Sequence, residues 1–277
     1  MNVLPREKQI QVISALVEGC SIRSTERLFD VHRDTIMRLM VRTGQHCMTL
    51  MDELMQNIPA GIYQCDELWC FVGKKDKRLK PHEKNNSEIG SQFIFVAMEA
   101  QTKLIPSWRI GKRAPEIAYS LMVDLADRMN GERPTIITDG FGPYLDAVDA
   151  AFGVNVDFAQ LIKVVSEVRK PTREGYVPAT VVRCDKKLVT GRPRPKTIST
   201  SLIERQNLTL RMSIRRLTRL TNAFSKSLDN LKAATALHFA HYNLCRIHRT
   251  LRITPAMAAG VTKTIWDMDA LLPNHQS

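Results

Sequence analysis

Three carboxylates stand at positions where the sequence predicts three different structural elements. Asp66 falls inside an expected strand over Ile62–Val72, Asp139 ends an expected strand over Thr135–Thr138, and Glu204 opens a basic helix. A charge in the middle of a strand is costly to bury unless something binds it. Three converging carboxylates can hold two divalent cations, an arrangement that suits phosphodiester chemistry. We therefore expect Asp66, Asp139 and Glu204 to be catalytic and to bind two Mg²⁺ or Mn²⁺ ions.

Each carboxylate also has an ordinary structural interpretation. Asp66 is compatible with a strand-edge charge paired with a lysine, and Asp139 with the first residue of a turn. Ser201-x-x-Glu204 matches a capping box, in which Glu204 would cap a helix N-terminus. Glu67 is expected on the opposite face of the strand from Asp66. The order of the three acids on these elements favours the shared site over three independent explanations.

The distribution of charge points to a polyanionic partner. The 277 residues include 40 Lys and Arg against 28 Asp and Glu, and residues 160–226 hold 16 of the basic but only four of the acidic ones. A merely solvated surface would mix the two signs, so this stretch favours phosphate contact. The residues expected to contact DNA there are Lys186, Lys187, Arg192, Arg194, Lys196, Arg211, Arg215, Arg216 and Arg219. A second basic run, Lys74–Lys80, fits either phosphate contact or an ordinary hairpin loop.

Residues 5–58 have a helical pattern in three pieces. Ser21 is a plausible N-cap for the short second piece, and a tight turn at Asp30 precedes the third. Helix, short helix, tight turn and helix is the helix-turn-helix pattern, although a plain three-helix bundle has the same periodicity. Ile36, Leu39 and Met40 are expected to face the core. The opposite face would enter the DNA major groove, and its residues are Arg33, Thr35, Arg38 and Arg42.

The order of elements after this segment predicts a mixed sheet. Strands are expected at Ile62–Val72, Gln92–Glu99, Leu104–Ile110, Thr135–Thr138 and Val154–Phe158, with helices at Ala114–Met129 and Tyr144–Phe152. This order matches a ribonuclease-H-like sheet better than a doubly wound one. The expected fold class is α/β (α+β), an all-α helix-turn-helix domain before a mixed-sheet catalytic domain. The expected bounds are 1–58, 59–265 with a basic insert at 160–200, and a tail at 266–277.

Several motifs resemble those of bacterial insertion-sequence DDE transposases, and most closely the insertion-sequence-one type. They are Cys65-Asp66-Glu67-Leu68-Trp69, Ile137-Thr138-Asp139-Gly140, Ile203–Asn207 with Arg215-Arg216-Leu217-Thr218-Arg219, and the tail Tyr242–Leu251. The resemblance implies a ribonuclease-H-like (integrase-like) core that cuts transposon ends and joins the 3′-hydroxyl to target DNA. It also implies that Asp66, Asp139 and Glu204 form the metal-binding triad. Double-stranded DNA and a homo-oligomer, a dimer or larger, are the expected partners.

The same features leave other functions open. Members of this group often carry an N-terminal zinc finger, but this chain has only Cys20 and Cys47 among its first 60 residues. A non-catalytic helix-turn-helix regulator, a decayed transposase copy or a nuclease of the same fold would share much of the pattern. The six cysteines are scattered and are expected to be reduced thiols. Without a long apolar stretch or an apolar leader, we expect no membrane partner and a cytoplasmic, nucleoid-associated location.

Overall fold

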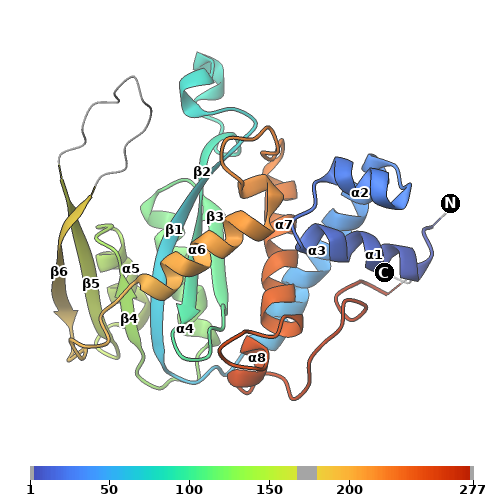
Figure 1. Ribbon diagram of the computed structural model, residues 1–277. Helices are drawn as coiled ribbons and strands as arrows, with labels where there is room; N and C mark the ends of the chain where they lie inside the picture. The colour runs from blue at the N-terminus through green and yellow to red at the C-terminus, as the bar shows by residue number, and fades with distance from the viewer. Residues whose placement is uncertain (1–2, 167–179, 275–277) are drawn as a thin grey trace.

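A six-stranded mixed sheet forms the centre of the computed structural model, which describes residues 3–166 and 180–274 (Figure 1). The strands are β1 (Ile62–Val72), β2 (Gly90–Glu99), β3 (Ser107–Gly111), β4 (Thr135–Thr138), β5 (Asp157–Val165) and β6 (Val181–Thr190). Their spatial order is β3-β2-β1-β4-β5-β6. The first three form an antiparallel meander, β4 and β5 run parallel to β1, and β6 pairs antiparallel with β5. This is the ribonuclease-H-like arrangement predicted from the order of elements.

Three strand predictions were wrong in their bounds. β2 begins at Gly90 rather than Gln92. β3 begins at Ser107 rather than Leu104, because Pro106 has no amide hydrogen to donate to a strand neighbour. β5 runs over Asp157–Val165 instead of Val154–Phe158. Its pairing with β6 continues the strand into residues 160–165, which were assigned to the basic insert. Residues 167–179 of that insert lie outside the described residues.

Successive side chains of β1 point to opposite faces of the sheet and therefore belong to two different hydrophobic clusters. Tyr63 and Cys65 join a cluster that includes α4 (Pro115–Arg128) and α5 (Tyr144–Phe152), whereas Leu68 joins a cluster that includes α6 (Ser201–Ser213). In Figure 1, α6 crosses one face of the sheet and α4 lies behind it. Asp66 therefore shares the α6 face, and Glu67 shares the face of α4 and α5.

Helix α6 carries Glu204 in its first turn. Its N-cap is Thr200, and no side chain caps the helix, so the capping box that was the alternative interpretation of Ser201 and Glu204 does not form. The helix ends at Ser213, and Arg215 lies beyond it in a separate 3₁₀ turn, Arg215–Leu217. Ile203 and Leu210 of the helix are buried, and so are Ile214 and Leu217 beyond its end.

The N-terminal segment contains the three helices that its pattern predicts. α1 covers Arg6–Val17, α2 covers Ile22–Phe29 and α3 covers Arg33–Leu54, so the expected third and connecting helices are one. Ser21 caps α2, since its Oγ accepts a hydrogen bond from the Ser24 amide at 3.0 Å. The three residues expected to face the core from α3 are buried: Ile36, Leu39 and Met40.

The C-terminal helices tie the N-terminal helices to the sheet. α7 (Leu228–Ala240) packs along α3, followed by a π-helical turn at His241–Cys245 and by α8 (Pro255–Ala258). The crossing is close at Gly44, where an added Cβ would lie 2.3 Å from the carbonyl oxygen of Ala233. One hydrophobic cluster consequently runs from Val12 to Leu272. None of the helices in the described ranges has the length and apolar character that crossing a bilayer requires.

Candidate active site

Asp66 is held on the α6 face of β1 by two hydrogen bonds. Its Oδ1 accepts from the Glu67 amide at 2.8 Å, and its Oδ2 accepts from Asn207 Nδ2 at 2.8 Å. Burial raises the pKa of Asp66 to about 6, and the neighbouring Asp139 and Glu204 charges act in the same direction. The two hydrogen bonds oppose this shift. The site thus positions a carboxylate that lacks a positive partner among the described residues.

Asp139 follows β4, the strand next to β1 in the sheet. Because Cys65 and Thr138 are partners in the parallel register, the residues that follow them, Asp66 and Asp139, come side by side. The loop that carries Asp139 is fixed by Gln160 of β5, whose Nε2 donates to the Asp139 carbonyl at 3.0 Å. The Asp139 carboxylate itself accepts from the Phe141 amide at 2.9 Å. The side chain therefore has a defined position at the end of its strand.

Glu204 reaches the same place from α6. Gln64 of β1 anchors the start of this helix, because its Oε1 accepts from the amides of Leu202 and Ile203 at 3.0 and 3.1 Å. These amides belong to the first helical turn, where intrahelical acceptors are missing. The Glu204 carboxylate accepts from Thr200 Oγ1 and forms an ion pair with Lys163 of β5. One polar residue of β1 thus fixes where Glu204 stands relative to Asp66.

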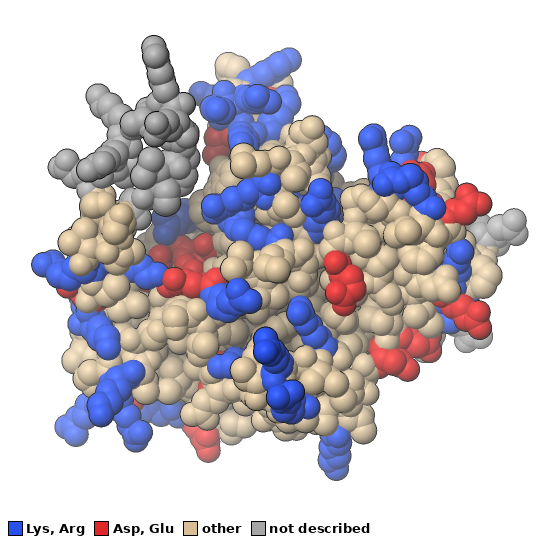
Figure 2. All heavy atoms as spheres, viewed as in Figure 1, with Lys and Arg blue, Asp and Glu red and all other residues tan. Residues whose placement is uncertain are grey.

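All three predicted carboxylates line one cavity of about 610 Å³. Asp66 comes from the sheet face, Asp139 from the end of β4 and Glu204 from α6; Arg113 and Lys163 supply positive charge to the same cavity. Figure 2 shows acidic side chains gathered in this hollow with Lys and Arg around it. The structure brings these three residues together, as the sequence analysis expected.

Glu67 is a fourth carboxylate of this site that sequence reasoning did not select. Asp66, Glu67 and Asp139 each place a carboxylate oxygen within 4.8 Å of the others. The Glu67 side chain is only 2% exposed, and burial raises its pKa to about 7, with the Asp139 charge adding to the effect. Glu67 does not line the cavity with the other three. The only feature of the sequence that could have pointed to Glu67 is its position directly after Asp66 in the strand.

Arg113 is the cation that compensates this buried charge. Its Nε donates to Glu67 Oε1 at 3.0 Å, and its Nη2 lies 3.8 Å from Asp139 Oδ2. The guanidinium carbon stands 4.3 Å from the ring centroid of Phe141, a distance typical of a cation–π contact. Arg113 therefore neutralises the carboxylates on the side away from α6.

Arg113→Met is expected to make the protein less stable without metal but more responsive to Mg²⁺. Removing the guanidinium leaves Glu67 buried and unpaired, which costs roughly 1–3 kcal/mol. That corresponds to a fall of several degrees in Tm for a chain of this size. Added Mg²⁺ would then offset more repulsion in the variant than in the wild type. Thermal denaturation with EDTA and with Mg²⁺ measures both effects, and Lys263→Met, at an exposed cation elsewhere, is the control. If Mg²⁺ raised Tm equally in the wild type, Arg113→Met and Lys263→Met, this role of Arg113 would be contradicted.

The donor atoms of the cavity suit hard divalent cations. Mg²⁺ and Mn²⁺ prefer carboxylate oxygens, and the cavity presents three carboxylates without a His or Cys among its described lining residues. Asp66 has no positive partner among the described residues, whereas Glu204 has Lys163. Asp66, Glu67 and Asp139 are the carboxylates close enough together to share one ion, and Glu204 lines the same cavity as Asp66 and Asp139.

The basic residues expected to contact DNA lie mostly on the surface. From α3, Arg33, Arg38 and Arg42 are exposed and Thr35 is half-buried. Those exposed elsewhere are Lys186, Lys187, Arg192, Arg194, Lys196, Arg215 and Arg219. Arg211 and Arg216 are half-buried, so their surroundings restrict what they can reach.

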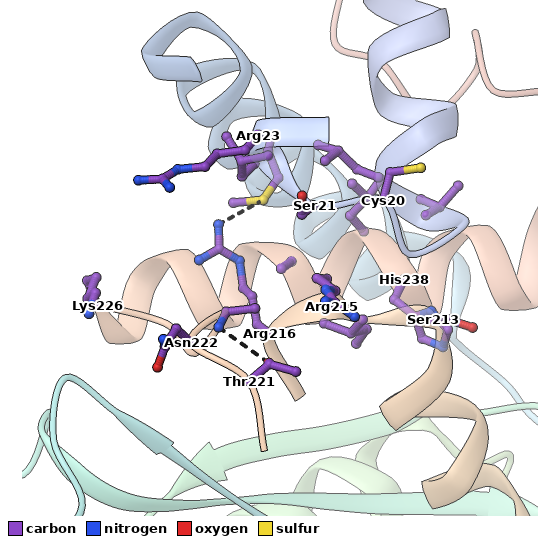
Figure 3. A pocket seen from close by; sticks show the side chains of 18 residues that line it. Cys20, Ser21, Arg23, Ser213, Arg215, Arg216, Thr221, Asn222, Lys226 and His238 are labelled. Carbon is purple, nitrogen blue, oxygen red and sulfur yellow. Dashed lines mark hydrogen bonds between the residues drawn. The ribbon is translucent and has the colours of Figure 1, made fainter. Parts of the chain in front are cut away.

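Arg216 enters a second cavity, of about 620 Å³, between the N-terminal helices and the 213–226 segment (Figure 3). Its guanidinium donates to Met37 Sδ at 3.1 Å and to Ser225 Oγ at 3.3 Å. Burial lowers the pKa of Arg216, and within the described ranges no carboxylate pairs with it. His238 of α7 also lines this cavity, and neither ring nitrogen has a hydrogen-bond partner among the described residues. His238 is packed in the core.

His238 is expected to make the fold sensitive to acid. Burial lowers its pKa from 6.5 to about 3, and His241 and Arg246 act in the same direction. Between those values the unfolded chain binds a proton that the folded chain excludes, so stability rises with pH through this window. His238 therefore lowers the free energy of unfolding by about 2 kcal/mol at about pH 5 relative to pH 7.

The measurement is urea unfolding of the wild type and His238→Leu at both pH values. Between pH 7 and pH 5, the free energy of unfolding should fall by about 2 kcal/mol less in the variant than in the wild type. His82→Leu, at an exposed histidine of the β1–β2 loop, should behave like the wild type. An equal fall in the free energy of unfolding in His238→Leu and the wild type would show that His238 does not resist protonation.

Comparison with known proteins gives matches among solved structures alone: no protein-family model and no curated protein matches the chain. One similar structure is the piggyBac transposase synaptic complex with hairpin DNA, at 12% identity and a TM-score of 0.41, covering 98% of this chain and 71% of that one. Another is the Mos1 strand transfer complex, at 13% identity and a TM-score of 0.24, covering 57% and 59%. The Mos1 mariner paired end complex with Mn has 12% identity and a TM-score of 0.24, covering 57% and 60%.

Proposed function

We propose that this chain is a DNA transposase of the DDE type, of bacterial insertion-sequence origin and closest to the insertion-sequence-one type. It would cleave DNA at transposon ends and join the freed 3′-hydroxyl to target DNA at the nucleoid. The observation that carries the proposal is the convergence of Asp66, Asp139 and Glu204 on one cavity from two parallel strands and a helix. The resemblance in motifs led to the same three residues independently of the fold.

Two divalent metal ions, Mg²⁺ or Mn²⁺, would be held by Asp66, Asp139 and Glu204. When bound, such ions activate the attacking oxygen and stabilise the leaving oxygen in phosphodiester cleavage. The protein's own groups orient the ligands: Asn207 holds Asp66, and the Phe141 amide holds Asp139. Lys163 lines the cavity beside Glu204, where its ammonium would contact an entering phosphate.

The basic surface and the helix-turn-helix supply DNA binding in this proposal. Residues 1–58 would recognise the transposon end through Arg33, Thr35, Arg38 and Arg42, while residues 59–265 carry the chemistry and 266–277 form a tail. The residues of the second half proposed to contact DNA are Lys186, Lys187, Arg192, Arg194, Lys196, Arg211, Arg215, Arg216 and Arg219. Pairing two DNA ends would require a dimer or larger assembly.

A non-catalytic helix-turn-helix regulator, including a decayed transposase copy, is the second candidate function. Exposed arginines on α3 and the net charge of +12 favour DNA binding in either case. Three carboxylates in a cavity among cations repel phosphate unless a cation intervenes, so a protein that only binds DNA gains nothing from them. This feature favours the enzyme.

The deciding experiment is cleavage and strand transfer on a labelled duplex that carries the element's own end, with Mg²⁺ and with EDTA. Joined products should appear only with Mg²⁺ and should be lost in Glu204→Gln, which keeps the side-chain shape and removes the charge. Glu132→Gln, at an exposed glutamate outside the cavity, is the matched control. Binding without cleavage under every metal condition would instead support the regulator. Cleavage without joining would support a nuclease.

A further inference from the structure

The cavity of about 620 Å³ between the N-terminal helices and the 213–226 segment has an apolar wall built from α1, α3 and α7. Leu16 and Val17 come from the end of α1, Met40 from α3, and Ala234 and Leu237 from α7. Small-molecule sites have volumes of about 300–1,000 Å³ and mostly apolar linings. This wall favours a ligand with an apolar body, because binding removes the apolar surface of that body from water.

Four cations line the same cavity. They are Arg23 of α2, Arg215 and Arg216 after α6, and Lys226 before α7. The described lining residues include no Asp or Glu, and none of the four cations forms an ion pair within residues 3–166 and 180–274. Figure 3 shows Arg23, Arg216 and Lys226 toward one end of the cavity, and His238 toward the other. The cavity therefore combines an apolar wall with positive charge that the fold leaves uncompensated.

Arg216 is the cation whose surroundings most clearly lack an anion. Its guanidinium donates to Met37 Sδ at 3.1 Å, to Met40 Sδ at 3.5 Å and to Ser225 Oγ at 3.3 Å. A guanidinium has five N–H donors, and a thioether sulfur is only a weak acceptor. Burial lowers the pKa of Arg216, since little compensates its charge. An anionic group in the cavity would supply the missing acceptor through charge-assisted hydrogen bonds.

His238 is a second polar group that folding leaves without a partner at this cavity. Its side chain is buried, and neither ring nitrogen has a hydrogen-bond partner among the described residues. Burial lowers the pKa of His238 to about 3, so the ring is neutral at neutral pH. A neutral imidazole carries an N–H donor and no negative charge, and it is therefore compatible with a bound anion.

We propose that this cavity binds a small organic anion with an apolar body, such as a medium-chain carboxylate. The apolar body packs on the wall formed by α1, α3 and α7, and the anionic group pairs with Arg216. A DNA phosphate would satisfy the cations but would leave the apolar wall uncovered. The site is separate from the carboxylate cavity, with which it shares none of its described lining residues. The inference does not depend on the proposed function, since it requires neither DNA nor a metal ion.

Two fluorescent dyes with the same aromatic rings test this assignment. Anilinonaphthalene sulfonate is an anion, and phenylnaphthylamine lacks the sulfonate. Titrations of the full chain in EDTA, without DNA, measure the affinity and stoichiometry of each dye. The wild type should bind one sulfonate dye per chain, about tenfold more tightly than the uncharged dye, because only the sulfonate pairs with Arg216. Decanoate should displace the sulfonate dye at lower concentrations than decanol, which has no charge, or inorganic phosphate, which has no apolar body.

Three variants separate the charge from the apolar wall. Arg216→Met should weaken binding of the sulfonate dye about tenfold and leave the affinity of the uncharged dye unchanged. This variant should keep its Tm, because an apolar side chain replaces a buried, unpaired charge. Ala234→Leu fills part of the cavity from α7 and should weaken binding of both dyes. Arg249→Met, at an exposed arginine outside the cavity, is the matched control and should change neither affinity.

Equal wild-type affinity for the two dyes, or an affinity for the sulfonate dye that Arg216→Met leaves unchanged, would overturn the proposal. Displacement by inorganic phosphate as readily as by decanoate would also overturn it, since the apolar wall would then take no part. If Arg216→Met had no cooperative thermal transition, Arg215→Gln/Lys226→Gln would replace it, because both residues are exposed. Unchanged binding of the sulfonate dye in that double variant would contradict the proposal, and weaker binding would support it.

Discussion

Asp66→Asn and Asp139→Asn each lower the rate of Mg²⁺-dependent DNA cleavage by about 10³-fold or more, the largest effects expected for this protein. Asparagine keeps the shape of the side chain but removes the charge that a divalent ion requires. A loss of 10³-fold corresponds to about 4 kcal/mol of transition-state stabilisation. Initial cleavage rates at saturating Mg²⁺ measure it. DNA affinity should be unchanged or higher, because a negative charge near the phosphates is removed.

Glu67→Gln is the comparison that identifies the third ligand. The Glu67 side chain is 2% exposed and contacts Arg113, whereas the Glu204 side chain is 40% exposed and lines the cavity. Glu204→Gln should therefore lower the cleavage rate as much as Asp66→Asn does, and Glu67→Gln should lower it far less. The reverse order would replace Glu204 by Glu67 in the metal-binding set.

The carboxylate site was predictable because its positions are local features of the sequence. An acid inside an apolar strand and an acid followed by glycine at a strand end are visible without a structure, as Asp66 and Asp139 show. Their adjacency follows from the order of elements, since a strand after the meander and its crossover helix returns parallel to β1. β1 and β4 have the predicted bounds because turn-forming residues stand at their ends: Gly61 and Gly73 flank β1, and Pro134 and Gly140 lie on either side of β4.

The partners of these carboxylates depend on tertiary contacts that sequence spacing does not contain. Arg113 is 46 residues from Glu67, and its position depends on the Phe141 ring. Gln64 and Gln160 are polar residues inside strands, and only the packing of α6 and the Asp139 loop gives them partners. β6 was missed because its residues are almost all exposed and show no apolar alternation. An edge strand that pairs with β5 alone carries little signal of its own.

Duplex DNA binding should weaken by about 10³- to 10⁵-fold between about 50 and 200 mM salt. That range applies to proteins that neutralise six to ten phosphates, because each neutralised phosphate releases condensed counterions. Twelve of the residues proposed to contact DNA are Lys or Arg, and ten of these twelve are exposed. The slope of log K against log salt concentration, measured by anisotropy in EDTA, gives the number of neutralised phosphates directly.

Charge-removing variants in three regions then locate the phosphate-binding residues. Lys186→Gln/Lys187→Gln on β6 and Arg215→Gln/Arg219→Gln after α6 should each reduce the slope by about 2, one unit for each phosphate that is no longer neutralised. Both variants should weaken binding to all duplexes alike. Arg33→Gln/Arg38→Gln on α3 should in addition remove the preference for the element's own end, because α3 is the helix proposed to read bases. An unchanged slope in a double variant would exclude that region from the DNA path, and an unchanged sequence preference in the α3 variant would move end recognition away from the helix-turn-helix.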